Sequence, residues 1–152
     1  MSKVSQRQIV ADIIPTTIQP DPLCVPPVWH AGRKYFAQVT GGEVQASVEK
    51  VYDGGKYSPE VLPAPIEVGD ITVTRHYDPG SDGDAIKAAR LVVGKARYNV
   101  NIYTLDGDLN IIQGRTRIYQ NALLVSITEP EGDSSSGGPA TFSLVFACEG
   151  VV

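Results

Sequence analysis

The side chains best suited to chemistry gather around His76. His76 follows Arg75 and lies between Asp70 and Asp78 in the sequence. A histidine that is oriented by a carboxylate can act as a general base. His76 and Asp78 would share one face of a strand, however, and no nucleophile is spaced to complete a triad. The pattern favours a surface or interface histidine, and a small hydrolase that uses His76 remains the weaker alternative.

Motifs for metals and cofactors are absent from the sequence. The two histidines and two cysteines form no Cys-x-x-Cys or His-x-His spacing. Asp82-Gly83-Asp84 lacks the downstream glutamate of a calcium loop. Trp29 beside His30 has the chemistry to stack on a base or sugar, although anchoring its own segment is the simpler role. We therefore expect no enzyme, no cofactor and no metal site.

Composition is that of an ordinary globular domain with an acidic surface. The chain has 152 residues, 42% of them hydrophobic and 20% charged, with a net charge of −4. This length predicts one domain, and the acidic balance argues against a protein that grips nucleic acid through its phosphates. No apolar run is long enough to span a membrane, and no signal peptide is evident. We expect a protein that is made in the cytoplasm, where Cys24 and Cys148 would stay free thiols.

The stretch Ile66–Asp78 carries the strongest strand pattern. Ile71, Val73, Arg75 and Tyr77 alternate with more polar neighbours, as in a half-buried strand. After an expected loop, Pro79–Gly83, the run Asp84–Val93 predicts a helix with Ser81 or Asp82 as its cap and Gly94 as its end. Its side chains expected to pack on the sheet are Ile86, Ala89 and Val93.

The remaining elements are expected to be strands. They span Lys34–Thr40, Glu43–Val51, Arg97–Leu105, Asp108–Gln113, Arg115–Tyr119, Ala122–Thr128 and Ala140–Ala147. Asp106-Gly107 predicts a two-residue hairpin turn. Core side chains are expected on the last strand at Phe142, Leu144 and Phe146. The predicted fold class is mainly β: a sandwich or barrel of seven or eight strands with one packed α-helix and an extended N-terminal arm.

Two segments carry apolar residues without an obvious place in a self-contained sandwich. Residues 1–32 are rich in proline and predict an extended arm preceding a domain at 33–152. We expect the arm to contact a neighbouring copy, so that deleting residues 1–28 would leave a folded monomer; wrapping around its own domain is the alternative. Tyr52–Pro65 predicts a projecting loop. The expected contact residues are Ile9, Ile13, Ile14, Ile18, Leu23 and Trp29 in the arm, and Tyr52, Tyr57, Val61 and Leu62 in the loop.

Three stretches together resemble one family. Thr40–Val44 (TGGEV), Val68–Tyr77 (VGDITVTRHY) and Glu129–Gly150 (EPEGDSSSGGPATFSLVFACEG) occur in the order and spacing typical of tail tube proteins of long-tailed bacteriophages. With the Tyr98–Thr104 strand, the resemblance covers residues 34 to 150. The arm is longer and richer in proline than in this family.

The resemblance implies a structural subunit rather than an enzyme. It implies six-subunit rings, stacked into a tube whose continuous inner β-barrel conducts viral DNA without binding it specifically. The partners it implies are further copies of the chain and the tail tape-measure, tail terminator and distal tail proteins, in the virion, with no membrane. Contractile-tail inner tubes and the type VI secretion tube share this fold. The alternative from another class is a monomeric β-barrel module that binds a peptide or glycan, or decorates a particle.

Overall fold

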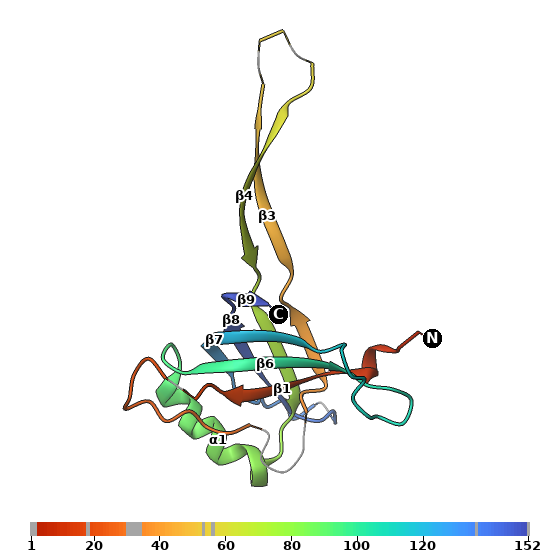
Figure 1. The fold of residues 1–152 in the computed structure, drawn as a ribbon. Coiled ribbons are helices and arrows are strands. Elements are labelled where there is room, and N and C mark those ends of the chain that lie inside the picture. Colours follow the sequence, from red (N-terminus) through yellow and green to blue (C-terminus); the bar gives the residue numbers. More distant parts are fainter. Residues whose placement is uncertain are drawn as a thin grey trace.

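The computed structural model describes residues 3–17, 19–29, 35–52, 54–55, 57–135 and 137–151. Within these ranges the chain forms a large curled sheet, a helix and a long hairpin (Figure 1). In chain order the elements are η1 (Gln6–Gln8), β1 (Ile9–Pro15), β2 (Gln38–Gly41), β3 (Val44–Val51), β4 (Glu60–Val68), β5 (Ile71–His76), α1 (Pro79–Val92), β6 (Arg97–Thr104), β7 (Arg117–Thr128), β8 (Thr141–Ala147) and β9 (Gly150–Val151).

The large sheet is antiparallel and curls around the core. Its strand order is β1-β6-β7-β8-β5-β2, and β9 pairs with β7. The two edges of the sheet meet where Ala11 of β1 and Phe36, just before β2, exchange hydrogen bonds of 3.0 and 2.8 Å between their backbones. The largest buried side chains inside this curl are Trp29, Tyr98, Tyr119, Phe36, Phe142 and Phe146. The predicted mainly β fold with one packed helix is confirmed.

Strand β5 keeps the predicted alternation and leads directly into α1. Ile71, Val73 and Arg75 are buried, while His76 at the end of the strand is exposed. The last strand behaves in the same way, because every second residue of β8, from Phe142 to Phe146, is buried as predicted. The alternation of apolar and polar residues predicts the buried face of these two strands correctly because each strand has one face on the core.

Helix α1 begins earlier than the predicted Asp84. Asp78 is the N-cap, and its side chain accepts a hydrogen bond of 3.1 Å from the backbone N–H of Gly80. Pro79 suits the first helical position because it has no N–H that would be left unbonded there. Asp82, expected in a loop or as the cap, lies buried in the first turn. Gly94 has a φ of +82° and follows the helix as predicted.

The N-terminal region is not a separate arm in its described parts. Strand β1 pairs with β6 along its whole length, from Ile9 opposite Thr104 to Pro15 opposite Tyr98. Ile13 is fully buried and Trp29 is 2% exposed in the core. The extended-arm prediction is therefore wrong for β1 and Trp29, and the alternative, that this segment wraps its own domain, holds for them. The proline content led to the wrong prediction of an arm because the prolines lie at the end of β1 and in the connection after it.

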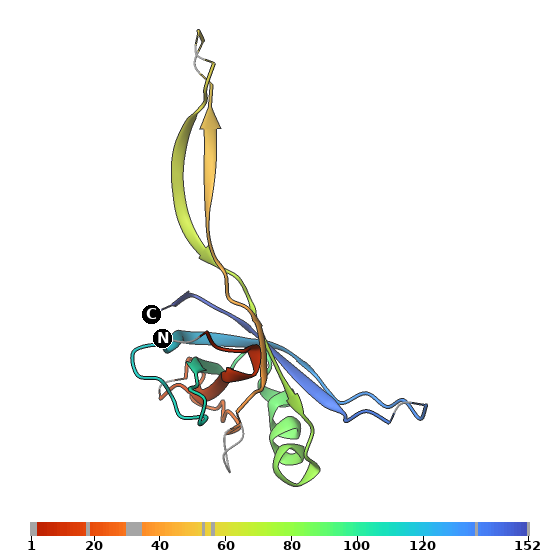
Figure 2. The same cartoon turned by 90° about the vertical axis from the view of Figure 1, so that its right-hand side faces the viewer.

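The proline-rich segment predicted as a loop is largely strand β4. Strands β3 and β4 form a separate two-stranded sheet that projects from one end of the curl (Figures 1 and 2). The loop prediction for Tyr57–Pro65 is wrong because each strand of a two-stranded ribbon is an edge strand, and an edge tolerates the missing N–H of proline. The register shifts between Ala46 and Val48, and Val48 then lies opposite Pro63.

The connection from β6 to β7 also differs from the prediction. Asp106-Gly107 is not a two-residue hairpin turn: Asp106 accepts backbone hydrogen bonds from Asp108 and Asn110, and Leu105 and Ile111 form only an isolated bridge. Strand β7 runs through the predicted break, with Asn121 at a φ of 56°. Strand β2 is shorter than predicted, beginning at Gln38.

Candidate assembly surfaces

The hairpin formed by β3 and β4 has one apolar face. In the register of β3 against β4, residues directly opposite each other point to the same side. Pairs that include β3 residues 44, 46, 48 and 50 therefore share one face, and pairs that include 45, 49 and 51 share the other. The exposed apolar side chains of the first face are Val44, Val48, Val61 and Ile66, with exposed fractions from 51% to 68%. The other face carries the glutamates Glu49, Glu60 and Glu67 together with Val51 and Leu62.

An isolated hairpin of this kind is marginally stable in water. Its strands extend about 27 Å for eight residues, and the described part of the chain packs only on its root. The four predicted loop residues all lie on this hairpin and are exposed: Tyr52 (69%), Tyr57 (106%), Val61 (53%) and Leu62 (40%). Val44, Val48 and Ile66 were not predicted as contact residues, although the weak alternation along β3 already indicated Val44 and Val48.

The root of the hairpin is held tightly. Gly41 has a φ of +87°, and a Cβ there would lie 2.0 Å from the carbonyl oxygen of Asp70, so only glycine fits. The hydroxyl of buried Tyr119 donates a hydrogen bond of 2.8 Å to the carbonyl of Gly42. Gly69 donates one of 2.8 Å to Glu43. These contacts fix the position at which the hairpin leaves the curled sheet.

A second apolar surface lies at the opposite end of the molecule. Leu23 (88%), Val25 (78%) and Leu91 of α1 (79%) are strongly exposed. They line a groove of about 480 Å³ together with Asp21, Cys24, Ala88, Val92 and Lys95. We call this the α1 groove. Leu23 was predicted as a contact residue, whereas Val25 and Leu91 were not.

The other predicted arm residues divide between the core and the surface. Ile9 is half-buried against the core, Ile13 and Trp29 belong to it, and Ile14 is 36% exposed. Ile18 lies outside the described residues. Contact with a neighbouring copy therefore remains a prediction for Leu23 and Ile14, and it remains untested for Ile18.

Helix α1 is fastened to the sheet by apolar packing and by a buried ion pair. Ile86 and Ala89 are buried as predicted, while Val93 is half-buried and Val92 takes the buried position. The guanidinium of Arg75 contacts the carboxylate of Asp82 and lies 4.5 Å from the centroid of the Phe36 ring. Because both charges are buried, losing either partner would be costly. Arg75, on the strand that ends at His76, therefore has a structural role.

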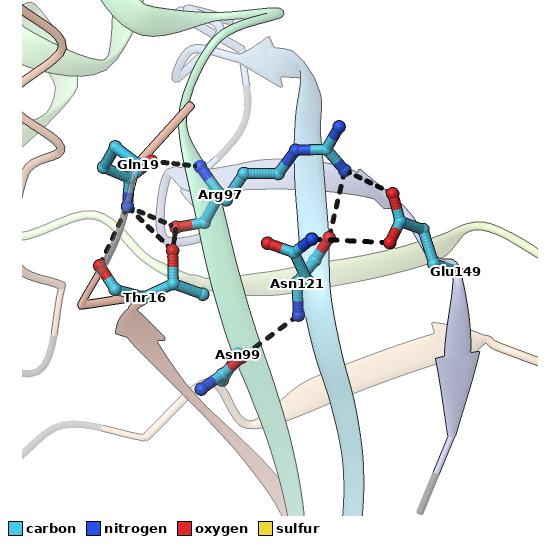
Figure 3. Close-up of polar contacts among 6 residues, drawn as sticks. All are labelled: Thr16, Gln19, Arg97, Asn99, Asn121 and Glu149. Atoms are coloured by element: carbon cyan, nitrogen blue, oxygen red, sulfur yellow. Dashed lines mark hydrogen bonds and ion pairs between the residues drawn. The ribbon is translucent and has the colours of Figure 1, made fainter. Parts of the chain in front are cut away.

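A polar network holds both terminal segments on the middle of the sheet (Figure 3). Gln19 accepts a hydrogen bond of 2.8 Å from the backbone N–H of Arg97 and donates one of 3.0 Å to its carbonyl. The Arg97 guanidinium donates to Glu149 at 2.9 Å and to the carbonyl of Asn121 at 3.1 Å. The network thus joins the segment after β1 and the segment before β9 to β6 and β7.

The reactive groups are dispersed or inaccessible. His76 is exposed, and the Asp78 carboxylate caps α1, so the two do not form the arrangement of an oriented base. Cys24 and Cys148 are free thiols; burial raises the pKa of Cys24, and burial followed by the charge of Asp70 raises the pKa of Cys148 to about 11. Burial also raises the pKa of Tyr98. Both thiols therefore carry little thiolate at neutral pH.

Two further findings concern metal ions and membranes. Within the described ranges, no three His, Cys, Asp or Glu side chains gather closely enough to hold a metal ion. No helix in the same part of the chain is both long and apolar enough to cross a membrane.

The sequence matches no established family and no curated protein, but the fold matches solved structures. A chain of the PVC sheath-tube complex, from an extracellular contractile injection system in the extended state, superposes with a TM-score of 0.71 at 14% identity, covering 99% of this chain and 90% of that one. A chain of the anti-feeding prophage tube-terminating cap gives 0.71 at 14%, covering 100% and 91%. Hcp1 from Flavobacterium johnsoniae gives 0.50 at 10%, covering 95% and 93%. The chain therefore has the same fold as these chains, among them chains from a sheath-tube complex and a tube-terminating cap.

Proposed function

We propose that this chain is a tube subunit that assembles into stacked rings, as in a phage tail or a related injection device. The observation that carries the proposal is the hairpin of β3 and β4, whose apolar face is uncovered within the described chain. Burying apolar surface contributes about 25 cal/mol per Å². An assembly in which a second copy covers this face would therefore be more stable than the separate copies. The similarity in fold to chains from sheath-tube complexes supports the same conclusion.

The finer parts of the proposal follow from the resemblance to tail tube proteins. Six copies form a ring, and the rings stack into a hollow tube in the virion, where tape-measure, terminator and distal tail proteins bind its ends. The net charge of −4 per chain suits a conduit for DNA, because like charges keep the polyanion from adhering. Two of the similar solved structures come from an extracellular contractile injection system, so a surrounding sheath is compatible with this fold as well as a sheathless tail.

The test is to replace Val44–Val68 with a short glycine-serine turn and to compare it with the wild type. We expect the wild type to form rings or tubes in negative-stain electron microscopy. The shortened protein should remain folded by circular dichroism and stay a single subunit in sedimentation, because the hairpin adds little to the core. A wild type that stays monomeric at high concentration would contradict the proposal and favour the alternative of a monomeric binding or decoration module.

A further inference from the structure

Two arginines share a pocket at one end of the curled sheet. Arg7 of η1 and Arg117 of β7 line a cavity of about 410 Å³ together with the apolar side chains of Ile9 and Val39. Within the described residues neither arginine forms an ion pair or a hydrogen bond, and no acidic side chain lines the cavity. We call this cavity the arginine pocket. Two guanidinium groups beside apolar side chains fit a ligand that carries carboxylates.

The strands place these side chains at the open end of the curl. Arg117 is the first residue of β7 and lies opposite the buried Ile102, so it occupies a core-facing position. Val39 lies opposite the buried Val73 and is core-facing as well. An arginine at such a position covers apolar surface with its stem and keeps its guanidinium in water. Arg117 therefore presents its charge at the mouth of the curl.

The complementary charges lie in residues 129–140, which connect β7 to β8. This segment has three acidic residues and no lysine or arginine. Glu129 is already paired with α1, whereas Glu131 is exposed and has no hydrogen bond or ion pair within the described residues. The hydroxyl of Ser135 donates a hydrogen bond of 2.7 Å to Asp133 and lowers the pKa of that carboxyl group, which therefore stays ionised.

We infer that the arginine pocket is a carboxylate-binding site, and that Glu131 and Asp133 of a second copy occupy it. The inference rests on the proposed tube function and deepens it, because it names surfaces by which neighbouring copies in one ring recognise each other. A contact between two different surfaces of identical copies is heterologous, and it closes a ring when the rotation between copies allows.

A chain cannot fill its own pocket with this loop. Arg117 and Thr128 are the first and last residues of β7, which has 12 residues and extends up to about 36 Å. Figure 2 shows the loop extending away from the sheet on the right, whereas the N-terminal segment lies on the left. The acidic loop and the arginine pocket therefore lie at opposite ends of one strand, and only a second copy brings them together.

The chemistry of the contact predicts how it acts. Ion pairs between exposed side chains add little affinity, but complementary charges speed the encounter of two proteins and orient them. The apolar face of the hairpin would supply the burial that holds the copies together, and the pocket would select the neighbour. Because salt screens exposed charges, the rate of assembly of wild type should fall about tenfold between about 0.05 M and about 0.5 M sodium chloride.

The experiment uses two charge reversals in the full chain, Arg117→Glu in the pocket and Glu131→Arg on the loop. Each replaces an exposed residue, so each should keep the wild-type circular dichroism spectrum and melting temperature. The matched controls are Arg115→Glu, two residues before the pocket arginine, and Glu67→Arg on the hairpin. Light scattering measures the rate of assembly, and negative-stain electron microscopy identifies rings. If a reversal lowers the melting temperature, Arg117→Gln or Glu131→Gln replaces it and should flatten the salt dependence.

We expect wild type and both controls to form rings at low salt, and each reversal alone to assemble at least about tenfold more slowly. An equimolar mixture of the two reversals should assemble at the wild-type rate, because each loop then meets a pocket of opposite charge in the other protein.

Three results would overturn the inference while the tube function stands: reversals that assemble like wild type, a mixture no faster than its components, or a wild-type rate that does not depend on salt. An equal loss of rate from Glu67→Arg would also overturn it, because the acids of the hairpin would then be the ligands. Wild type that forms no assembly at any salt concentration would overturn both the inference and the proposed function.

Discussion

The curled sheet and the hairpin use similar residues in opposite ways. Val73, Val100 and Leu144 in the sheet are fully buried, whereas Val44, Val48 and Val61 in the hairpin are more than half exposed. The sheet curls around its own apolar faces and meets itself at Ala11 and Phe36, while the hairpin has no second layer in the described chain. Strand-forming residues therefore serve folding where the chain supplies a facing layer, and they serve assembly where another molecule must supply that layer.

The largest effect that distinguishes the two regions should come from deleting residues 1–28. This deletion removes β1 and the buried Ile13, and it uncovers the edge of β6. We expect no cooperative unfolding transition by circular dichroism, in contrast to the folded protein that should remain after the hairpin is replaced. A soluble, cooperatively folded product would restore the interpretation of this segment as a separate arm.

The next largest effect should come from Asp82→Ala. The variant leaves the Arg75 guanidinium buried without this carboxylate, and breaking a buried pair in this way costs about 3–5 kcal/mol. Urea unfolding measures the loss. Asp84→Ala, which alters an exposed residue of the same helix, should change stability by less than about 0.5 kcal/mol. Adding Arg75→Met to Asp82→Ala should recover part of the loss; no recovery would argue that the pair is not the cause.

A smaller effect is expected from Arg97→Ala. The variant removes the hydrogen bonds from the guanidinium to Glu149 and Asn121, with an expected loss of about 1–2 kcal/mol because Glu149 is largely exposed. Hydrogen exchange should increase first in β9, which this arginine helps to hold. The control is Arg115→Ala, because the Arg115 guanidinium donates a hydrogen bond of 3.4 Å to the carbonyl of its own neighbour, Gly114. Equal effects of the two variants would count against a specific role of the network.

The smallest effect should be a dependence of stability on alkaline pH that arises from Cys148. Its pKa is raised from 9.0 to about 11 in the folded protein, chiefly by burial. The unfolded chain therefore loses this proton first, so the contribution to stability is full below pH 9 and is lost as the pH rises toward 11. Urea midpoints measured across this range should fall more steeply for wild type than for Cys148→Ala. In the protein whose hairpin has been replaced, Cys148→Ala should change the slope of the urea midpoint against pH by the same amount. Parallel curves for wild type and Cys148→Ala would contradict the assignment of this pH dependence to Cys148.

Some parts of the fold could be predicted from sequence because their pattern arises within one element. Alternation placed β5 and β8 correctly, and Gly94 marked the end of α1, because these signals depend on neighbouring residues along the chain. The exposed apolar residues Tyr52, Tyr57, Val61 and Leu62 were also found from sequence, although as a loop rather than a hairpin.

The partner of each apolar segment, by contrast, becomes visible only in the folded chain. Trp29 and Ile13 look like arm residues in sequence, yet they lie in the core because β6, far along the chain, pairs with β1. The first turn of α1 likewise depends on Arg75 from the preceding strand, and the faces of the hairpin depend on a register shift opposite Ala46 and Val48. Such choices are long-range because a strand pattern states that one face must be covered but carries no information about which distant segment, or which second copy, will cover it.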